Sequence, residues 1–405
     1  MKPIVRAGRM KPVHSDIRGP LFVEAMKRQK QGIDILKLNT GNPATFGFGL
    51  PDSIKNALME HMQDGVGYCD FKGMPQARQA ICDYETSKGI KGITPDDVFI
   101  GNGVSEVVSF ALTPLLNDGD EVLVPSPSYS LWGNSVYLEA GKAVFYTCDE
   151  QANWYPDIQD IRSKITDKTK AIVIINPNNP TGVLYPKEIL LEIIQVAREF
   201  GLLIFADEIY DRLVMDGKQH ISLASLTEDV PVITLNGLSK SHCLCGYRCG
   251  WMVISGPREL TEDYRQGIIQ LTSLRLCANT MAQIVIPAAL DDMETPASMV
   301  RPGGRIYEQR EATVRELEKI DGLSFVKNDA AFYVFPKLDV KKFNITNDKQ
   351  FAHDLLDVTN ILLVPGSGFD WKDPDHFRIV MLPQADILSD AIRRMGTFLD
   401  GYKQK

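Results

Sequence analysis

Residues 171–182 read AIVIINPNNPTG, a run of five apolar residues followed directly by a polar turn. The same change occurs within 202–210, LLIFADEIY, and within 232–240, VITLNGLSK. Short apolar runs rich in Ile and Val are typical of strands that are buried on both faces of a sheet. In an open parallel sheet, ligands bind beyond the carboxyl ends of the strands. Three strands that each end in polar residues therefore predict a binding site at that edge.

Further strands and helices alternate around these three segments. We expect strands at 98–100, 121–124, 143–146 and 251–254, and helices at 105–116, 131–138 and 187–200. Such alternation favours an α/β fold built on a mostly parallel central sheet.

The two ends of the chain have a different pattern. The N-terminal part contains the turn Arg18-Gly19-Pro20, an amphipathic helix and a strand that ends in Gly41-Asn42-Pro43. Beyond residue 300 we expect a helix at 306–320 and strands near 332–335 and 377–380. These features predict a smaller α/β domain formed by residues 1–45 and 296–405, and a large domain formed by residues 46–295.

The composition is that of an ordinary globular protein. The 405 residues carry a net charge of −8 and 44% of them are apolar, which excludes a disordered chain and argues against a nucleic-acid partner. The apolar runs are too short to cross a bilayer, so no membrane association is expected. The seven scattered cysteines indicate reduced thiols, and no apolar segment of a secretory signal follows the basic first ten residues. The sequence therefore predicts a cytoplasmic protein.

The polar residues after the three strands offer complementary chemical groups. Lys240 supplies an amine and Asp207 a carboxylate, while Tyr210 supplies a phenol and Asn179 an amide. A lysine amine can form a Schiff base with a carbonyl group, which is the link that a pyridoxal cofactor requires. A buried carboxylate would keep the pyridine nitrogen protonated, and the phenol and amide would hydrogen-bond the ring oxygen. These residues therefore indicate a pyridoxal site.

Three motifs occur in an order that resembles a known family. They are Asn176-Pro177-x-Asn179-Pro180-Thr181-Gly182, Asp207-x-x-Tyr210, and Ser239-Lys240 followed by Arg248. Over nearly its whole length the chain resembles the fold-type-I, pyridoxal-phosphate-dependent aminotransferases of classes I and II. The segments 16–20 (DIRGP), 38–43 (LNTGNP) and 237–240 (GLSK) are similar to those of bacterial alanine (glutamate–pyruvate) aminotransferases.

The resemblance implies how pyridoxal 5'-phosphate would be held. Lys240 carries the cofactor and moves the reacting proton, Asp207 pairs with the ring nitrogen, and Tyr210 contacts the ring oxygen. Asn179 shares that contact, and Tyr129 matches the aromatic residue that stacks on the ring. The residues implied around the phosphate are Val104 and Ser105 (through their backbone N–H groups), Ser239, Arg248, and Tyr68 contributed by the partner subunit.

The same resemblance implies the substrate contacts and the reaction. Arg378 is expected to bind the α-carboxylate of the substrate in a bidentate fork, beside Asn179 and the backbone N–H of Gly41. Arg18 and Arg275 are candidates for binding the distal carboxylate of glutamate. The implied reaction is reversible amino transfer between L-alanine and 2-oxoglutarate, giving pyruvate and L-glutamate in ping-pong order. Because Tyr68 would serve the neighbouring site, a homodimer with shared active sites is also implied.

Some residues depart from the family pattern and leave alternatives open. Ser15 stands where an aromatic residue is usual, and Gly237 stands where a serine often contacts the phosphate. Cys243 and Cys249 occupy places that are usually small or aliphatic. Amino transfer from branched-chain or aromatic amino acids, or cleavage of a carbon–sulfur bond, would use the same lysine. A cofactor-binding regulator without turnover is a further alternative. No metal is expected, because the cysteines after His242 have no second ligand pair nearby.

Overall fold

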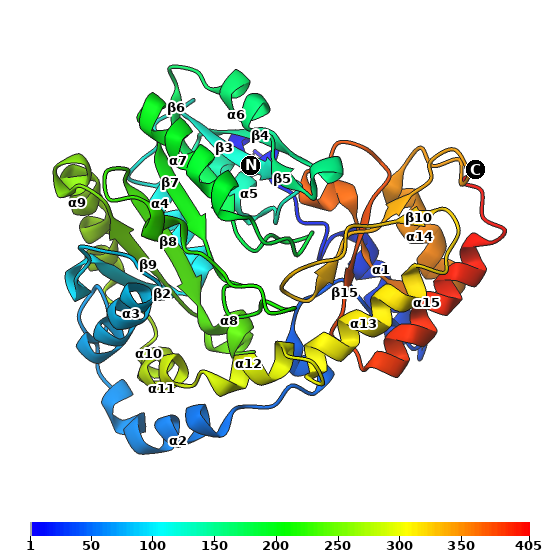
Figure 1. Ribbon diagram of the computed structural model, residues 1–405, viewed down its shortest axis with the longest axis horizontal. Coiled ribbons are helices and arrows are strands. Elements are labelled where there is room, and N and C mark those ends of the chain that lie inside the picture. Colours follow the sequence, from blue (N-terminus) through cyan, green and yellow to red (C-terminus); the bar gives the residue numbers. More distant parts are fainter. Residues whose placement is uncertain (1) are drawn as a thin grey trace.

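The computed structural model describes residues 2–405, and its largest feature is an eight-stranded sheet (Figure 1). Its strands are β2 (Val98–Asn102), β3 (Glu121–Ser126), β4 (Lys142–Asp149), β5 (Tyr155–Pro156), β6 (Thr169–Ile175), β7 (Leu203–Asp207), β8 (Val232–Gly237) and β9 (Cys249–Ser255), in the spatial order β2-β9-β8-β7-β6-β3-β4-β5. The pairs from β8 through β7, β6 and β3 to β4 are parallel. β9 is antiparallel to both of its neighbours, and β5 is antiparallel to β4. The predicted α/β fold with a mostly parallel sheet is confirmed.

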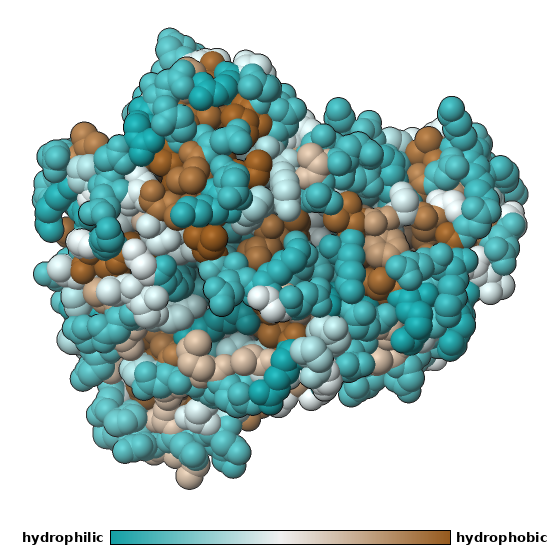
Figure 2. All heavy atoms as spheres, in the orientation of Figure 1, coloured by the Kyte–Doolittle hydropathy of each residue, from teal (hydrophilic) through white to brown (hydrophobic). Residues whose placement is uncertain are grey.

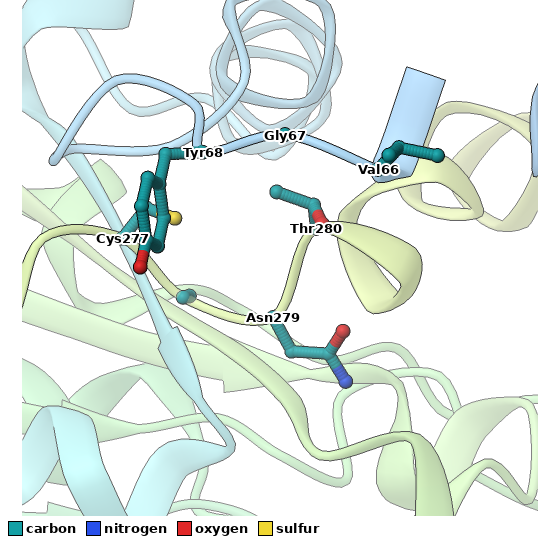
Figure 3. A pocket seen from close by; sticks show the side chains of 7 residues that line it. Val66, Gly67, Tyr68, Cys277, Asn279 and Thr280 are labelled. Atoms are coloured by element: carbon teal, nitrogen blue, oxygen red, sulfur yellow. The ribbon is translucent and has the colours of Figure 1, made fainter. Parts of the chain in front are cut away.

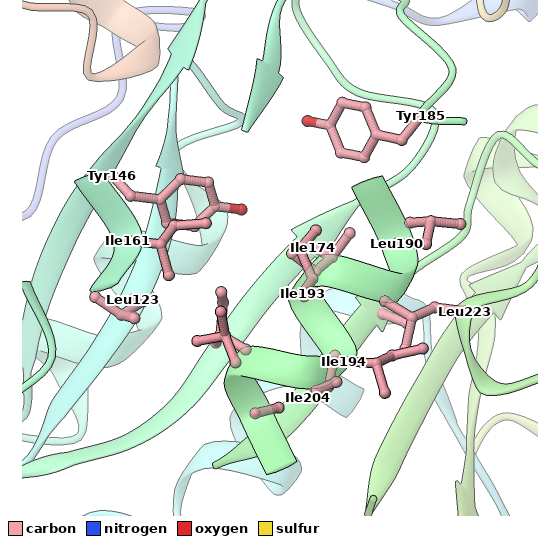
Figure 4. Close-up of a cluster of buried hydrophobic side chains, with 14 of the residues drawn as sticks. Leu123, Tyr146, Ile161, Ile174, Tyr185, Leu190, Ile193, Ile194, Ile204 and Leu223 are labelled. Carbon is pink, nitrogen blue, oxygen red and sulfur yellow. The ribbon is translucent and has the colours of Figure 1, made fainter. Parts of the chain in front are cut away.

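Helices cover both faces of this sheet because its central strands are apolar on both sides. The helices around the sheet are α2 (Asp52–His61), α3 (Pro75–Ser87), α4 (Val104–Leu112), α5 (Leu131–Leu138), α6 (Ile158–Lys164), α7 (Lys187–Phe200), α8 (Leu238–Ser241), α9 (Arg258–Arg275), α10 (Thr280–Ile284) and α11 (Ile286–Asp291). In β6, Ile172 and Ile174 pack into a core with Ile193 of α7. Figure 4 shows Ile174 and Ile193 in this core. Val173 and Ile175 pack into a second core with α4 and α5. Successive strand residues point to opposite faces, which explains the unbroken apolar run.

A second, smaller unit is formed by segments from both ends of the chain. Its helices are α1 (Pro20–Lys30), α13 (Arg305–Leu317), α14 (Asp348–Thr359) and α15 (Ala385–Leu399), and α12 (Glu294–Val300) leads into it. Its short strands are β1 (Leu36–Lys37), β10 (Leu323–Ser324), β11 (Tyr333–Val334), β12 (Lys337–Leu338), β13 (Ile361–Leu362), β14 (Val364–Pro365) and β15 (Phe377–Val380). In Figure 1 the blue helix α1 lies beside α14 among the orange and red C-terminal elements.

Backbone pairing and a shared core join the two chain ends in this unit. β1 pairs in parallel with β13, at Leu36 with Ile361. Leu38, next in the N-terminal segment, belongs to the same apolar core as Leu355 of α14 and Ile392 of α15. The proposed domain boundaries at residues 45 and 296 stay a prediction.

Element boundaries agree with the sequence pattern in some places and differ in others. The helices expected at 131–138 and 187–200 have those bounds. The helix expected at 105–116 ends instead at Leu112. Pro114 follows closely, and proline cannot donate the N–H that a continuing helix requires.

The face of the molecule in Figure 2 is mainly hydrophilic, with hydrophobic side chains scattered in small groups. Across residues 2–405, no single helix has both the length and the apolar composition that a membrane span requires. The bent pair of α9 and Thr280–Asp291 meets those criteria only when its two parts are counted together, and they are bent by 119°.

Replacing Ile193 by Ala is expected to destabilise the fold. Ile193 is fully buried between α7 and the sheet, so the change removes apolar contacts and leaves a cavity. The free energy of unfolding should fall by about 2–5 kcal/mol, measured by urea denaturation. Leu191→Ala in the same helix is the control: Leu191 is 42% exposed, and the expected change is only about 0.5 kcal/mol. Equal losses in the two variants would contradict this assignment of the core.

Candidate active site

The carboxyl ends of β6, β7 and β8 lie side by side, so the polar segments that follow them meet. Ile175 pairs with Asp207, and Asp207 pairs in turn with Leu235. After these strands the chain runs into the polar turn at 176–182 and into α8. The residues brought to this edge of the sheet are Asn179, Asp207, Tyr210 and Lys240.

Lys240 is a half-buried residue of α8 that contacts the N-terminal segment. Its Nζ donates a hydrogen bond to the backbone O of Gly41 at 3.0 Å and lies 5.8 Å from the centre of the Phe332 ring. Burial lowers the pKa of this amine, but Tyr333 and the Cys245 thiol raise it by more, so the pKa lies above its ordinary value. The amine therefore lies between the large sheet and residues from both ends of the chain.

Asp207 ends β7 as a buried carboxylate. The indole Nε1 of Trp132 donates to one carboxylate oxygen at 3.1 Å, and the backbone N–H of Ile209 donates to the other at 3.3 Å. Burial raises the pKa of Asp207 to about 6, although both hydrogen bonds act in the opposite direction. A buried carboxylate with a raised pKa is ready to accept a cationic partner, such as a protonated ring nitrogen.

Tyr210 is paired with a second tyrosine that no sequence motif indicated. The hydroxyl groups of Tyr210 and Tyr333 lie 3.0 Å apart, and both side chains are buried. Tyr333 also lies against Gly41, where a Cβ would be only 2.3 Å from the Tyr333 hydroxyl oxygen. Glycine at position 41 is therefore required for this close approach. Sequence reasoning missed Tyr333 because it lies 123 residues from Tyr210 along the chain.

Arg378 is a buried cation that faces the same site from β15. Its guanidinium lies 4.6 Å from the ring centres of Tyr333 and Phe369. One terminal N–H group donates to Asn179 Oδ1 at 2.8 Å, and the other donates to the backbone O of Asn39. Burial lowers the pKa of the guanidinium, and its Nε has no hydrogen-bond partner among residues 2–405. An anionic ligand would satisfy this buried donor.

The N-terminal end of α4 forms a turn suited to an anion. Gly103, at φ 83°, precedes the helix without a side-chain cap, so the N–H groups of Val104 and Ser105 have no acceptor within the helix. Arg248, at φ 54°, is so close that a Cβ on Gly103 would lie 2.4 Å from its guanidinium. A Cβ on Gly250 would likewise lie 2.4 Å from the backbone N of Val104. Backbone N–H groups at a helix N-terminus beside an arginine are typical of phosphate sites.

Most of the chain matches one known family. The family model described as aminotransferase class I and II matches residues 33–392. The chain belongs to this family. It is 50% identical to the glutamate-pyruvate aminotransferase AlaA of Haemophilus influenzae and 47% identical to AlaA of Escherichia coli, over 404 residues and the full length of both chains in each case.

Solved structures agree with this assignment. An aminotransferase from Escherichia coli matches with a TM-score of 0.98 and 47% identity over the whole of both chains. The alanine aminotransferase of Pyrococcus furiosus matches with a TM-score of 0.93 and 40% identity, over 98% of this chain and 100% of the other. The predicted aminotransferase family and its fold are thereby confirmed.

Three further residues of the aminotransferase are predicted at the site. Tyr129 is 38% exposed. Ser239 is half-buried next to Lys240, and its backbone O accepts a hydrogen bond from the Cys245 thiol at 2.9 Å. Arg18 is exposed, in the turn that precedes α1. Their roles toward cofactor and substrate stay predictions.

Tyr68 lies on an exposed segment of the aminotransferase, with 84% of its surface accessible. With residues that include Val66, Cys277 and Thr280, it lines an open pocket of about 540 Å³ (Figure 3). Such exposure is what a residue that completes a neighbouring subunit's site requires. Its contribution to a partner stays a prediction.

Arg275 of the aminotransferase has partners within the protein. It forms an ion pair with Glu106 of α4 at 2.5 Å and donates to the backbone O atoms of Phe71 and Ile100. Its contact with the distal carboxylate of glutamate stays a prediction.

The stability of Asp207→Asn relative to the wild type is expected to depend on pH. The pKa of Asp207 is about 6 in the folded, cofactor-free protein and about 4 in an unfolded chain. Ionisation of Asp207 therefore opposes folding, by an amount that grows as the pH rises from about 4 to about 6 and then levels off. Asn carries no charge, so the variant should gain about 1 kcal/mol relative to the wild type between pH 5 and pH 8.

Thermal unfolding of the cofactor-free proteins at these two pH values measures the difference. Asp118→Asn, which removes a carboxylate from an exposed turn, is the matched control for the substitution itself. An equal stability difference between Asp207→Asn and wild type at pH 5 and pH 8 would show that the pKa of Asp207 is not raised.

Proposed function

We propose that this aminotransferase transfers an amino group reversibly between L-alanine and 2-oxoglutarate, with pyridoxal 5'-phosphate held on Lys240. The observation that carries the proposal is the buried Arg378, whose Nε lacks a partner within residues 2–405. It faces a site that also holds the Lys240 amine, so an α-amino acid can place its carboxylate on one group and its amino group near the other. The names of the curated relatives, glutamate-pyruvate aminotransferase, support alanine and glutamate as the donors.

The residues present fit pyridoxal 5'-phosphate at three points. The buried carboxylate of Asp207 suits a pyridinium nitrogen, because a cation there would offset its burial. The turn at Gly103 and the guanidinium of Arg248 suit the phosphate. The amine of Lys240 suits the aldehyde. When bound, the cofactor supplies an aldehyde that accepts the substrate amino group and a ring that withdraws electrons from the α-carbon.

The protein side chains would position the reacting atoms and move one proton. Lys240 would take the proton from the substrate α-carbon and return it to the cofactor carbon. Tyr210 would hydrogen-bond the ring oxygen, and its contact with Tyr333 fixes the orientation of its hydroxyl group. Asp207 would keep the ring nitrogen protonated, because a buried carboxylate beside that nitrogen favours its cationic form.

Arg378 would bind the substrate α-carboxylate and set its orientation. The hydrogen bond from Arg378 to Asn179 Oδ1 holds the guanidinium plane, which leaves Nε for the ligand. The backbone N–H of Gly41 would complete the contact, and Arg18 is the candidate for the distal carboxylate of glutamate. Arg18 is exposed, so it can move to a substrate that carries a second charge.

A half-reaction screen tests the substrate assignment. Each of twenty amino acids is mixed with the pyridoxal form, and the visible absorbance of the bound cofactor is followed. Alanine and glutamate should react fastest, and initial rates with both substrates varied should give parallel double-reciprocal plots. Lys240→Ala is the control and should abolish turnover while keeping the wild-type circular dichroism spectrum.

Other outcomes would replace the proposal by a defined alternative. Faster reaction of branched-chain or aromatic amino acids would move the assignment to those donors. Pyruvate release from cystathionine would favour cleavage of a carbon–sulfur bond. Cofactor binding without amino transfer from any donor would favour a regulator.

Homodimers with shared sites are part of the proposal, with Tyr68 completing the partner's phosphate site. Dimers that combine a Lys240→Ala subunit with a Tyr68→Phe subunit hold one site with both native residues. Such mixtures should regain about a quarter of the wild-type rate, because half of the dimers are hybrids with one intact site. The mixed activity must exceed the average of the two separate variants. No gain on mixing would argue that each subunit has a self-contained site.

A further inference from the structure

A buried lysine outside the predicted cofactor site binds three carboxylates beside it. Lys88 follows the end of α3, and its Nζ lies 2.7 Å from Glu85 Oε2, 2.8 Å from Glu208 Oε2 and 3.1 Å from Asp211 Oδ2. Glu85 also accepts a hydrogen bond from Trp251 Nε1 at 3.2 Å. We call Lys88 and these three carboxylates the Lys88 cluster. All three carboxylates are buried, and burial raises the pKa of Glu85 to about 7. The Lys88 ammonium is the cation that all three contact, and it offsets part of their charge.

Glu208 follows Asp207 in the sequence, and the two carboxylates contact residues of different helical segments. Asp207 is held by Trp132 of α5, whereas Glu208 is held by Lys88 after α3. The second oxygen of Glu208 accepts hydrogen bonds from Ser222 Oγ at 2.9 Å and from the backbone N–H of Leu223 at 3.0 Å. Any shift of Glu208 therefore reaches Asp207 through one peptide unit.

Asp211 connects the segment after β7 to the segment that carries Lys240. It is the neighbour of Tyr210, and its Oδ2 accepts hydrogen bonds from Asn236 Nδ2 at 2.7 Å and from the Tyr84 hydroxyl at 2.6 Å. Asn236 lies at the end of β8, and its own Oδ1 accepts from the backbone N–H of Gly237 at 2.7 Å. Gly237 immediately precedes α8, the helix of Lys240.

His220 connects the Lys88 cluster to the turn that follows β6. Its Nε2 lies 3.1 Å from the backbone O of Asn176, which begins the turn that carries Asn179. The same Nε2 lies 4.0 Å from Glu208 Oε2. Burial lowers the pKa of His220, so we assign it as a neutral hydrogen-bond donor to the Asn176 carbonyl.

We propose that Lys88 is a positioning residue for amino transfer: its ammonium group fixes the segments that carry Asp207, Tyr210 and Lys240 relative to one another. The proposal rests on the proposed roles of those three residues. Without the ammonium group, three buried carboxylates would repel one another, and the segments they anchor would separate. Glu208, Asp211 and His220 resemble a set of metal ligands in their spacing, but the Lys88 ammonium already supplies the cation between the two carboxylates.

The test compares Lys88→Met, which removes the charge, with Lys88→Arg, which keeps it, both as holoenzymes. The first measurement is the pH midpoint at which the visible absorbance of the lysine-bound cofactor changes. The second is the change in kcat and the change in KM for alanine, measured separately. Lys88→Met should shift the midpoint by about 0.5 unit or more and lower kcat about tenfold or more, with KM changed by less than about threefold. Lys88→Arg should restore most of both values.

Arg265→Met is the matched control, because it removes a comparably buried cation away from the site. Arg265 pairs with Asp97 at 2.5 Å, and both residues are buried. This variant should lower the melting temperature but leave the absorbance midpoint and kcat unchanged. If Lys88→Met behaves in the same way, Lys88 is only a stabilising residue and the proposal is wrong.

A second variant decides the question if Lys88→Met fails to fold. Glu208→Gln keeps an oxygen for Ser222 and Leu223 but loses the ion pair with Lys88. It should shift the midpoint and lower kcat with KM little changed, and wild-type values of the midpoint and kcat would overturn the proposal. The absorbance measurement needs no particular donor, so it stands even if the half-reaction screen rejects alanine as the substrate.

Discussion

The in-register parallel pairing of β6, β7 and β8 is the constraint on which the rest of the site depends. Because Ile175, Asp207 and Leu235 lie in one row, the polar residues that follow the strands converge without any long loop. Side chains alternate along a strand, so a slip of one residue in β7 would turn Asp207 to the opposite face of the sheet. Its carboxylate would then lose the hydrogen bond from Trp132. Correct register therefore decides which carboxylate is available to a ligand.

The site holds two buried charges of opposite sign that the protein itself only partly compensates. Asp207 receives two hydrogen bonds and forms no ion pair within residues 2–405, and Arg378 lies near two aromatic rings with one donor left over. Burial of such groups opposes folding of the empty protein. A ligand with a cationic ring and an anionic carboxylate satisfies both groups, so binding and stability are linked. Asp207 and Arg378, which would select the ligand, therefore make the protein more stable when the ligand is bound.

Local sequence was sufficient to locate the strand ends, and all four central residues follow from motifs next to those ends. Asp207 directly follows an apolar run, and Asn179, Tyr210 and Lys240 lie within five residues of the end of one. Contacts between distant segments were not predictable in the same way. Tyr333 and Lys88 reach their partners Tyr210 and Glu208 across 123 and 120 residues, and nothing near them in the sequence marks a function.

Arg275, a candidate for the distal carboxylate of glutamate, has an ion-pair partner that the sequence did not indicate. Its partner Glu106 lies 169 residues away, and only the packing of α9 against α4 brings the two together. The roles of Tyr68 and Arg18 could not be settled from one chain, because both side chains are exposed. A residue that acts on a partner subunit or on a substrate needs no contact within its own chain, so the structure of that chain does not indicate its role.

The pairing of the two chain ends has a consequence for how the molecule is made on the ribosome. Asn39 and Arg378 are in contact although 339 residues separate them. At usual rates of translation, on the order of tens of seconds pass between the synthesis of the first and the arrival of the second. During that interval the large sheet can already form, whereas the first forty or so residues have no partner strand. A nascent chain would thus contain a folded large sheet and an unpaired N-terminal segment until the C-terminal residues have been synthesised.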